Sequence, residues 1–455
     1  MESCCGLAMM PYANVCSHCR YCASARIRYT YNGMKYNLND KPTPGPFLLY
    51  GLQWWVVTLP CVIILGVVVS RLHYTDIAMQ TWYTRKLFGV MGVATIVQVL
   101  FGHRLPLVIG PASTLLVGLI ASQAAGINAL YTAVFLGGAV LALAGFTGLL
   151  ERLRFFFTPR IVAVVLVLIA FTLSPTILGL IFSGPPETKG FSFCFALGAA
   201  LALVVVNDRL PGAAKSLTVL IGLAGGTAIH FVAVGFPTLP NVSAMPEATD
   251  FPWLIRPAFD PGVLLSFVFC FLALTINELG SIESLGRMLQ AESMDERVRR
   301  GAGVTGLANM AAGGLGVIGP VDFSMSAGII AATGCASRYT LIPAGLGLLA
   351  CAFLPQVVVL LGAVPGPVMG ALLLYLMATQ LASGLHMLVA EKGVTDFSTG
   401  ITVGLPLMVG LIIAFAPADV FSAFPAMFKP IIGNGFVMGT IAVILLEHGI
   451  FRQKK

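Results

Sequence analysis

The sequence predicts an all-α polytopic membrane protein with fourteen transmembrane segments, arranged as two inverted repeats of seven spans. Of its 455 residues, 57% are hydrophobic and only 10% are charged, a composition typical of multi-pass membrane proteins. Apolar runs of transmembrane length follow one another with short polar joins. The tetrapeptide Val-Ile-Gly-Pro occurs at residues 108–111 and again at 317–320, about half of the hydrophobic chain apart.

Hydropathy places the spans in the following order. They cover about 47–70, 83–101, 104–122, 128–149, 160–182, 190–206, 216–235, 262–289, 300–316, 318–335, 338–361, 366–385, 399–416 and 431–451. An odd number of spans per half makes the second half enter from the opposite side, so the repeats must be inverted. We expect residues 47–236 and 262–451 to form the repeats, with the Pro-rich loop 237–261 as an extracytoplasmic linker.

The distribution of basic residues predicts the orientation. With residues 1–46 and 452–455 as cytoplasmic tails, six of the 26 Lys and Arg residues lie in outside loops: Arg71, Arg85, Lys86, Lys189, Arg256 and Lys429. This asymmetry follows the positive-inside rule. The net charge of +7 therefore reports orientation in a plasma (inner) membrane, with the lipid bilayer as partner, and no nucleic-acid partner is expected.

Residues 1–33 differ from the rest of the chain. Cys16, Cys19 and Cys22 surround His18 at a spacing that could hold zinc or an iron–sulfur cluster. No second Cys-x-x-Cys motif and no spaced pair of histidines accompany them, so we favour no metal and no cofactor. The segment lacks the continuous apolar core of a signal peptide. We interpret it as a dispensable extension or as a misassigned start, with Met34 as the true start.

Two breaks interrupt the apolar pattern in corresponding halves, at Gly110-Pro111 in span 3 and at Gly319-Pro320 in span 10. Unpaired backbone groups are costly in hydrocarbon, so such breaks belong against protein or a water-filled cavity. Paired Gly/Pro breaks are typical of secondary-transporter binding sites. Ala112 and Ser113 follow the first break, and Asp322, Phe323 and Ser324 follow the second, so each break is followed by small or polar residues, with Phe323 as the aromatic exception.

Span 8 carries the strongest chemical signal, the sequence Asn277-Glu278 in an apolar run followed by Ser281. Glu278 lies about fifteen residues from the outer end, near mid-bilayer at about 1.5 Å per residue. An ionisable group at that depth indicates function, the alternative being a hydrogen-bonded cluster between helices. Glu283, nearer the cytoplasm, is expected to be solvated.

Three further polar residues are ambiguous. Gln53 in span 1 could bind a ligand or bridge two helices, and the residues alone leave both open. His103 and Arg104 fall in the predicted cytoplasmic join before span 3, where we expect both to be solvated.

These features together resemble the nucleobase–ascorbate transporter family, the nucleobase:cation symporters of the uracil/xanthine permease type. The family signature on span 10 corresponds to Met325–Gly334, where Gly328, Thr333 and Gly334 are in register. Its first two positions, which the family uses around its substrate, are replaced by Met325 and Ser326. Phe323 matches the aromatic residue that usually precedes the signature, and Leu52-Gln53 and the stretch 105–110 are also similar.

Span 8 departs from the family in one position. The family places a glutamate three residues before a glycine, and relative to Gly280 this position is Asn277, with Glu278 beside it. The resemblance covers about residues 34–450 and specifies architecture better than substrate.

The resemblance implies a uracil-permease-like fold with a core domain and a gate domain. Spans 3 and 10 would begin as short extended strands and continue as half-length helices. We expect Gly110-Pro111 and Gly319-Pro320 to end these strands, with each proline in the first turn of the helix. The helix N-termini would then direct unpaired N–H groups toward one midplane site.

The family function implied is proton-coupled symport of a nucleobase of the uracil or xanthine class. Glu278 and Asn277 would accept the ring N–H groups, the half-helix amides with Ser113 or Ser324 would donate to carbonyls, and Phe323 would stack. The predicted substrate-binding set is Gln53, Ala112, Ser113, Asn277, Glu278, Ser281, Asp322, Phe323, Ser324 and Met325. Glu278 would carry the proton, and Asp322 is the second candidate.

Two alternatives use the same scaffold. The sulfate-permease family is similar in fold and carries small anions such as sulfate or carboxylates, and Met325 in place of an acid lowers the cost of binding one. A passive channel is the other alternative. The motifs HExxH, GxSxG and the P-loop are absent from the sequence, so an enzyme is not expected. Sodium coupling and a homodimer remain open.

Overall fold

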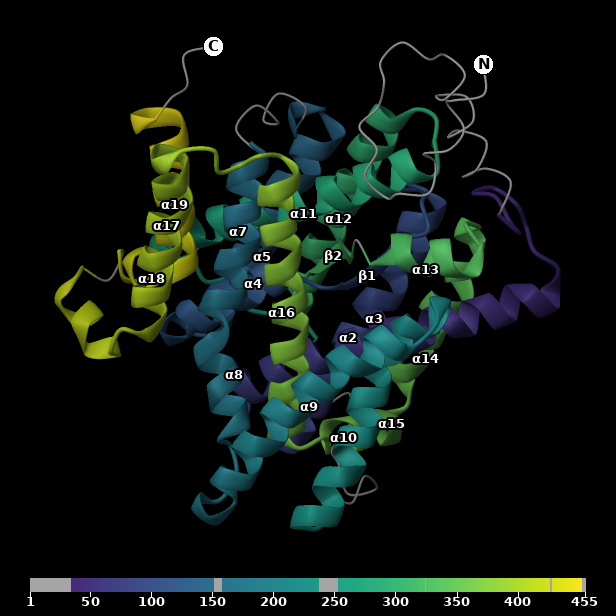
Figure 1. The fold of residues 1–455 in the computed structure, drawn as a ribbon, viewed down its shortest axis with the longest axis horizontal. Coiled ribbons are helices and arrows are strands. Elements are labelled where there is room, and N and C mark those ends of the chain that lie inside the picture. Colours follow the sequence, from purple (N-terminus) through teal and green to yellow (C-terminus); the bar gives the residue numbers. More distant parts are fainter. Residues whose placement is uncertain (1–33, 151–157, 237–252, 324, 426–427, 452–455) are drawn as a thin grey trace, which may run out of the picture.

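The structure is a computed structural model that describes residues 34–150, 158–236, 253–323, 325–425 and 428–451. Helices make up most of it, and one two-stranded sheet lies near the middle of the molecule (Figure 1). The N-terminal cysteines at 16, 19 and 22 and much of the expected linker fall outside the described residues.

The helices and strands follow the predicted order of apolar runs. The first half contains α2 (Pro44–His73), α3 (Ile77–Leu100), β1 (Val108–Pro111), α4 (Ser113–Ala121), α5 (Ile127–Phe146), α7 (Pro159–Thr172), α8 (Ser174–Ile181), α9 (Lys189–Arg209) and α10 (Thr218–Val234). The second half contains α11 (Pro261–Met288), α12 (Met294–Leu315), β2 (Pro320–Phe323), α13 (Ser326–Thr333), α14 (Leu341–Phe353), α15 (Pro355–Gly362), α16 (Gly366–Ala390), α17 (Phe397–Phe415), α18 (Lys429–Ile432) and α19 (Gly435–Leu445).

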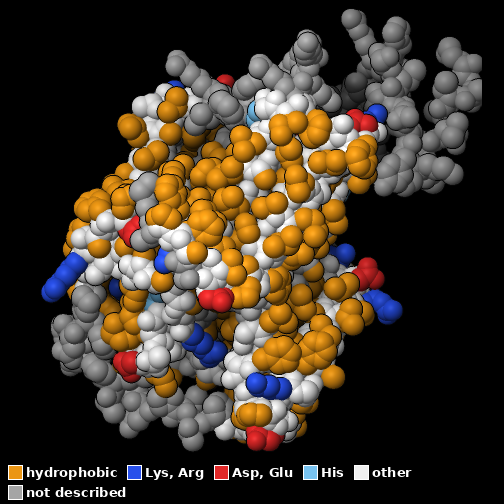
Figure 2. Space-filling view, turned by 90° about the vertical axis from the view of Figure 1, so that its left-hand side faces the viewer, with side chains coloured by type: hydrophobic (Ala, Val, Ile, Leu, Met, Phe, Trp, Pro, Cys, Tyr) orange, Lys and Arg blue, Asp and Glu red, His pale blue; other side chains and the backbone are white. Residues whose placement is uncertain are grey.

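Several helices can cross a bilayer. Within the described residues, seven are long and apolar enough: Pro44–His73, Ile127–Phe146, Pro159–Ile181, Pro186–Arg209, Pro261–Met288, Gly366–Ala390 and Phe397–Phe415. The other predicted spans coincide with shorter or less apolar elements, so the number fourteen stays a prediction. Hydrophobic side chains are spread widely over the face shown in Figure 2. Large apolar side chains are exposed on several helices, and Phe397 at the start of α17 is 84% exposed. Such a surface suits contact with lipid.

The two breaks form one antiparallel sheet. Val108 pairs with Phe323, Ile109 with Asp322, Gly110 with Val321 and Pro111 with Pro320. The strands expected from the family resemblance in spans 3 and 10 are therefore present. Each is followed by a short helix, α4 or α13.

The expected position of the prolines was wrong. Pro111 is the last residue of β1, with Ala112 between it and α4, and Pro320 is the first residue of β2. The two prolines face each other at the end of the ladder, where a missing N–H is tolerated. The first Val-Ile-Gly-Pro copy is the whole of β1, whereas the second precedes β2 and contributes only its proline.

Close backbone approach packs the helices around this sheet. α3 packs against α14, and α5 packs against α12. A Cβ added at Gly306 of α12 would lie 2.2 Å from the backbone nitrogen of Ala142 on α5, so only glycine fits. In the predicted repeats, α3 and α12 are the second spans, and α5 and α14 are the fourth. Packing of the second span of each repeat against the fourth span of the other is what inverted repeats would produce. The repeat relation itself stays a prediction.

Candidate functional site

The paired strands hold the starts of the two half-helices in place. Just beyond the end of the ladder, the N–H of Ala112 donates to the carbonyl of Gly319 at 2.9 Å. At the other end, the hydroxyl of Ser326, the first residue of α13, accepts the N–H of Val108 at 2.8 Å. Helices α4 and α13 therefore begin at opposite ends of the same small sheet, and each presents N-terminal N–H groups there.

One face of the sheet carries an aromatic ring. A Cβ at Gly110 would lie 2.5 Å from Cε2 of Phe323, so the ring packs directly on the bare backbone of β1. Phe323 is half-buried, as are Met325 at the start of α13, Ser113 at the start of α4 and Asn277 on α11. A half-buried ring beside polar helix ends can offer a stacking surface to a planar ligand.

Glu278 lies along the edge of β2 that β1 does not pair with, and it is completely buried. Its Oε1 accepts the hydroxyl of Thr305 on α12 at 2.5 Å, and its Oε2 accepts the backbone N–H of Asp322 at 3.0 Å. The hydroxyl of Ser281, one turn along α11, donates to the carbonyl of Asp322 at 3.1 Å. Two side chains of α11 thus hold both backbone groups of one strand residue.

Asp322 is also completely buried, and its carboxylate points toward a histidine. Nε2 of His103 lies 3.2 Å from Oδ2 of Asp322, an ion-pair distance, although the contact lacks the geometry of a good hydrogen bond. His103 is 0% exposed, so the expectation that it is solvated was wrong. The loop containing it folds inward and is covered by α12, whose Arg297 donates to the carbonyl of His103 at 2.9 Å.

Two buried amides complete this network. Nε2 of Gln98 on α3 donates to the hydroxyl oxygen of Thr305 at 2.7 Å, and Oε1 of Gln98 accepts the N–H of His103 at 3.2 Å. Asn309 on α12 donates to the carbonyls of Thr305 at 2.8 Å and Pro320 at 2.9 Å. Sequence reasoning missed Gln98, Thr305 and Asn309, although polar residues inside predicted spans were the signal that identified Glu278.

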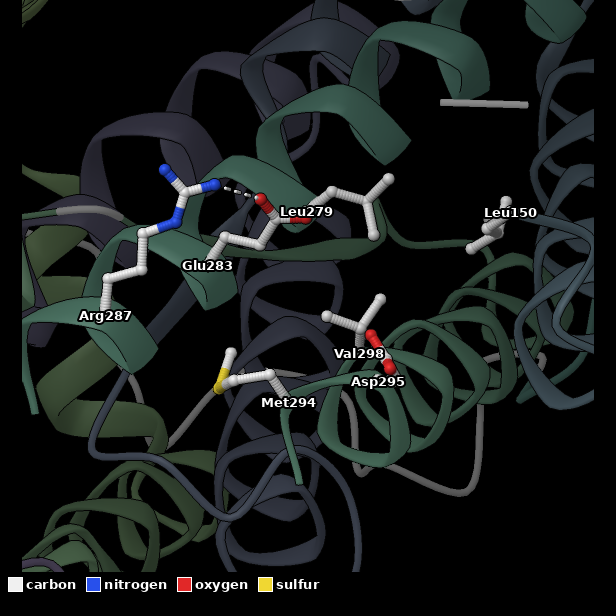
Figure 3. A pocket seen from close by; sticks show the side chains of 7 residues that line it. All are labelled: Leu150, Leu279, Glu283, Arg287, Met294, Asp295 and Val298. Atoms are coloured by element: carbon white, nitrogen blue, oxygen red, sulfur yellow. Dashed lines mark hydrogen bonds and ion pairs between the residues drawn. The ribbon is translucent and has the colours of Figure 1, made fainter. Parts of the chain in front are cut away.

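Glu283 is not part of the hydrogen-bonded network around Glu278. It is half-buried, pairs with Arg287 at 3.1 Å, and lines a separate cavity with Met294, Asp295 and Val298 (Figure 3). Leu150 stands on the far side of that cavity. The ion pair involves an Arg287 side chain that is 79% exposed, so it contributes little to stability.

The structure brings only part of the predicted set together. Glu278, Ser281 and Asp322 share one hydrogen-bonded network, and Phe323 packs on Gly110 next to it. Gln53 on α2 is half-buried and makes no hydrogen bond to another described residue, and the same holds for the Asn277 amide. Ser324 lies outside the described residues. In the described part of the chain, no group of three or more His, Cys, Asp or Glu is arranged to hold a metal.

The chain matches known proteins over most of its length. A sequence model described as the permease family, of the xanthine/uracil type, matches residues 45–419. The chain belongs to this family. It is 26% identical over 374 residues to the uric acid permease PucJ of Bacillus subtilis, covering 78% of this chain and 82% of PucJ. It is 23% identical to the uric acid transporter UacT of Escherichia coli, covering 90% and 88%.

Solved transporters of other families share the fold. The transmembrane domain of the cyanobacterial bicarbonate transporter BicA superposes with a TM-score of 0.62 at 16% identity, covering 81% of this chain and 95% of that domain. The inward-facing murine anion transporter Slc26a9 gives a TM-score of 0.58 at 14% identity, covering 97% of this chain and 74% of that one. At these identities the likeness shows the fold alone. The permease is thus a multi-pass membrane protein.

Proposed function

We propose that this permease carries a nucleobase of the oxopurine or uracil type across the plasma membrane, together with a proton. The family match over residues 45–419 carries the proposal, because the relatives named above and the uracil permease of Bacillus caldolyticus take up bases of this kind. The transporters of small anions are related by fold alone, so the anion alternative has weaker support.

The substrate would lie against the half-buried face of the sheet. The ring of Phe323 on Gly110 offers a flat surface, and the N-terminal N–H groups of α4 and α13 can donate to ring carbonyls. The Asn277 amide can accept a hydrogen bond from the substrate or donate one to it. Met325, directly before α13, offers an apolar side chain that can adapt its shape to the ligand. Gln53 and Ser113 extend the same proposed set.

The coupling proton would reside on the buried carboxyl pair. Glu278 and Asp322 are both completely buried and close enough to repel each other when both are charged. Two unpaired negative charges are very costly in a low-dielectric interior, so a proton on the pair stabilises it. Glu278 is the proposed carrier because its two oxygens contact both α12, through Thr305, and the strand, through Asp322.

We also propose a topology. We place residues 47–236 and 262–451 in two inverted repeats and both ends of the chain in the cytoplasm. The antiparallel pairing of β1 with β2, each followed by a short helix, supports the repeat.

Uptake by the purified permease in proteoliposomes tests the function. We expect labelled uric acid, xanthine or uracil to accumulate under an inward proton gradient and the accumulation to vanish with a protonophore. Sulfate and bicarbonate serve as competing substrates, and a sodium gradient at equal pH tests the other coupling ion. Accumulation of an anion but of no nucleobase would overturn the proposal, and flux that ignores both gradients would indicate a channel.

A further inference from the structure

His103 is a titratable neighbour of the proposed coupling pair, and its ring has a defined proton arrangement. The N–H of Leu105 donates to Nδ1 of His103 at 2.9 Å. A backbone N–H can only donate, so Nδ1 must be the unprotonated acceptor of the ring. In the neutral imidazole the single ring proton therefore sits on Nε2, which is the nitrogen 3.2 Å from Oδ2 of Asp322.

We propose that His103 holds its single ring proton on Nε2, next to the carboxyl of Asp322, and stabilises the charged form of that carboxyl across the 3.2 Å contact, without itself carrying the transported proton. Accepting a second ring proton would place one on Nδ1, opposite the Leu105 N–H, in a site that is fully buried. His103 is thus a positioning residue. This role rests on the proposed coupling function, whereas the tautomer itself does not.

The groups around Asp322 are consistent with a neutral histidine. Glu278 faces it from α11 and His103 faces it from the loop before β1. The cation of Arg297 on α12 is turned to the backbone, donating to the carbonyls of His103 at 2.9 Å and Arg104 at 3.0 Å. In the described residues, neither the carboxyl of Asp322 nor Nε2 of His103 has a hydrogen-bond partner of good geometry. The N–H at Nε2, 3.2 Å from Oδ2, is thus free to interact with the charged carboxyl.

Substitution by asparagine separates the two contacts of His103. In His103→Asn, the side-chain oxygen can still accept the Leu105 N–H as in an Asx-turn, but the shorter side chain cannot reach Asp322. We expect the pH of half-maximal proton-driven uptake to move up by about one unit, since a carboxylate loses one charge-assisted donor. His103→Gln, whose longer amide can reach Asp322, should restore part of this shift. His386→Asn, on the exposed surface of α16, is the matched control.

Nitrogen-15 NMR of the histidine-labelled wild-type protein tests the tautomer without any transport. We expect the His103 signals, assigned by their loss in His103→Gln, to show one protonated and one unprotonated nitrogen from about pH 5 to pH 8. A doubly protonated ring in this range, or a proton on Nδ1, would overturn the tautomer whether or not nucleobases are transported. An unchanged pH profile in His103→Asn would overturn the positioning role while leaving the proposed coupling pair intact.

Discussion

Glu278→Gln separates proton coupling from substrate binding at the buried network. The glutamine oxygen can still accept the hydrogen bond from the backbone N–H of Asp322. The glutamine NH2 group can donate to the hydroxyl oxygen of Thr305, which already accepts a hydrogen bond from Gln98 at 2.7 Å. The Thr305 hydroxyl proton then loses its acceptor, at a cost of about 1 kcal/mol. We therefore expect a folded protein with a slightly lower melting temperature.

Transport should change far more than stability. One pH unit is worth about 1.4 kcal/mol, so symport with one proton can drive about tenfold accumulation of substrate. In Glu278→Gln the neutral amide cannot cycle a proton, so accumulation should fall to the level outside. Exchange of labelled for unlabelled nucleobase at equal pH should persist in part, because the half-buried face of the sheet is not altered.

Glu283→Gln is the matched control for this experiment. It makes the same substitution five residues further along α11, in a side chain paired with the exposed Arg287. Such a pair contributes about 0–1 kcal/mol, so accumulation should stay near tenfold. Should Glu278→Gln accumulate nucleobase as well as wild type, Glu278 is not the carrier, and Asp322→Asn becomes the deciding variant.

Three other predictions concern the sheet and its packing. Gly110→Val should displace the Phe323 ring, because the new Cβ would lie 2.5 Å from Cε2 of that ring. We expect the variant to insert normally into the membrane and its dissociation constant for the nucleobase, measured at equilibrium, to rise at least about tenfold. Gly306→Leu should lower the yield and melting temperature of the folded protein by separating α12 from the backbone of Ala142, an overpacking cost of about 1–3 kcal/mol or more. A double-mutant cycle of Glu278→Gln with Phe323→Leu should show a coupling of about 0.5 kcal/mol or more in nucleobase affinity, and simple additivity would contradict it.

The sequence predicted the centre of the fold but not its register. Gly/Pro breaks in both halves identified the region of the sheet, and the family resemblance implied its strands. The prolines were misplaced because a proline fits the first turn of a helix and the end of a strand equally well on local grounds. Only the partner strand, more than two hundred residues away, decides between these positions.

Local pattern also could not find the partners of Glu278. A carboxylate in an apolar run is visible in one segment, but Thr305 is an ordinary residue of α12 until it meets Glu278 across 27 residues of chain. Gln98 meets Thr305 across 207 residues. His103 was expected to be solvated because nothing within its own segment shows that α12 covers the loop. These errors share one cause, which is that burial by distant elements leaves no local signal.

In the proposed mechanism, the network gives a physical route by which protonation of the buried pair can change substrate binding. Glu278 binds the backbone of Asp322, and His103 faces the side chain of the same residue. Successive residues of a strand face opposite sides, so the next residue, Phe323, turns its ring to the half-buried face over Gly110. A proton gained or lost at Glu278, beside the unpaired edge of β2, therefore alters the hydrogen bonds of the strand one residue from the ring. Coupling through the strand does not require the proton and the nucleobase to share a ligand.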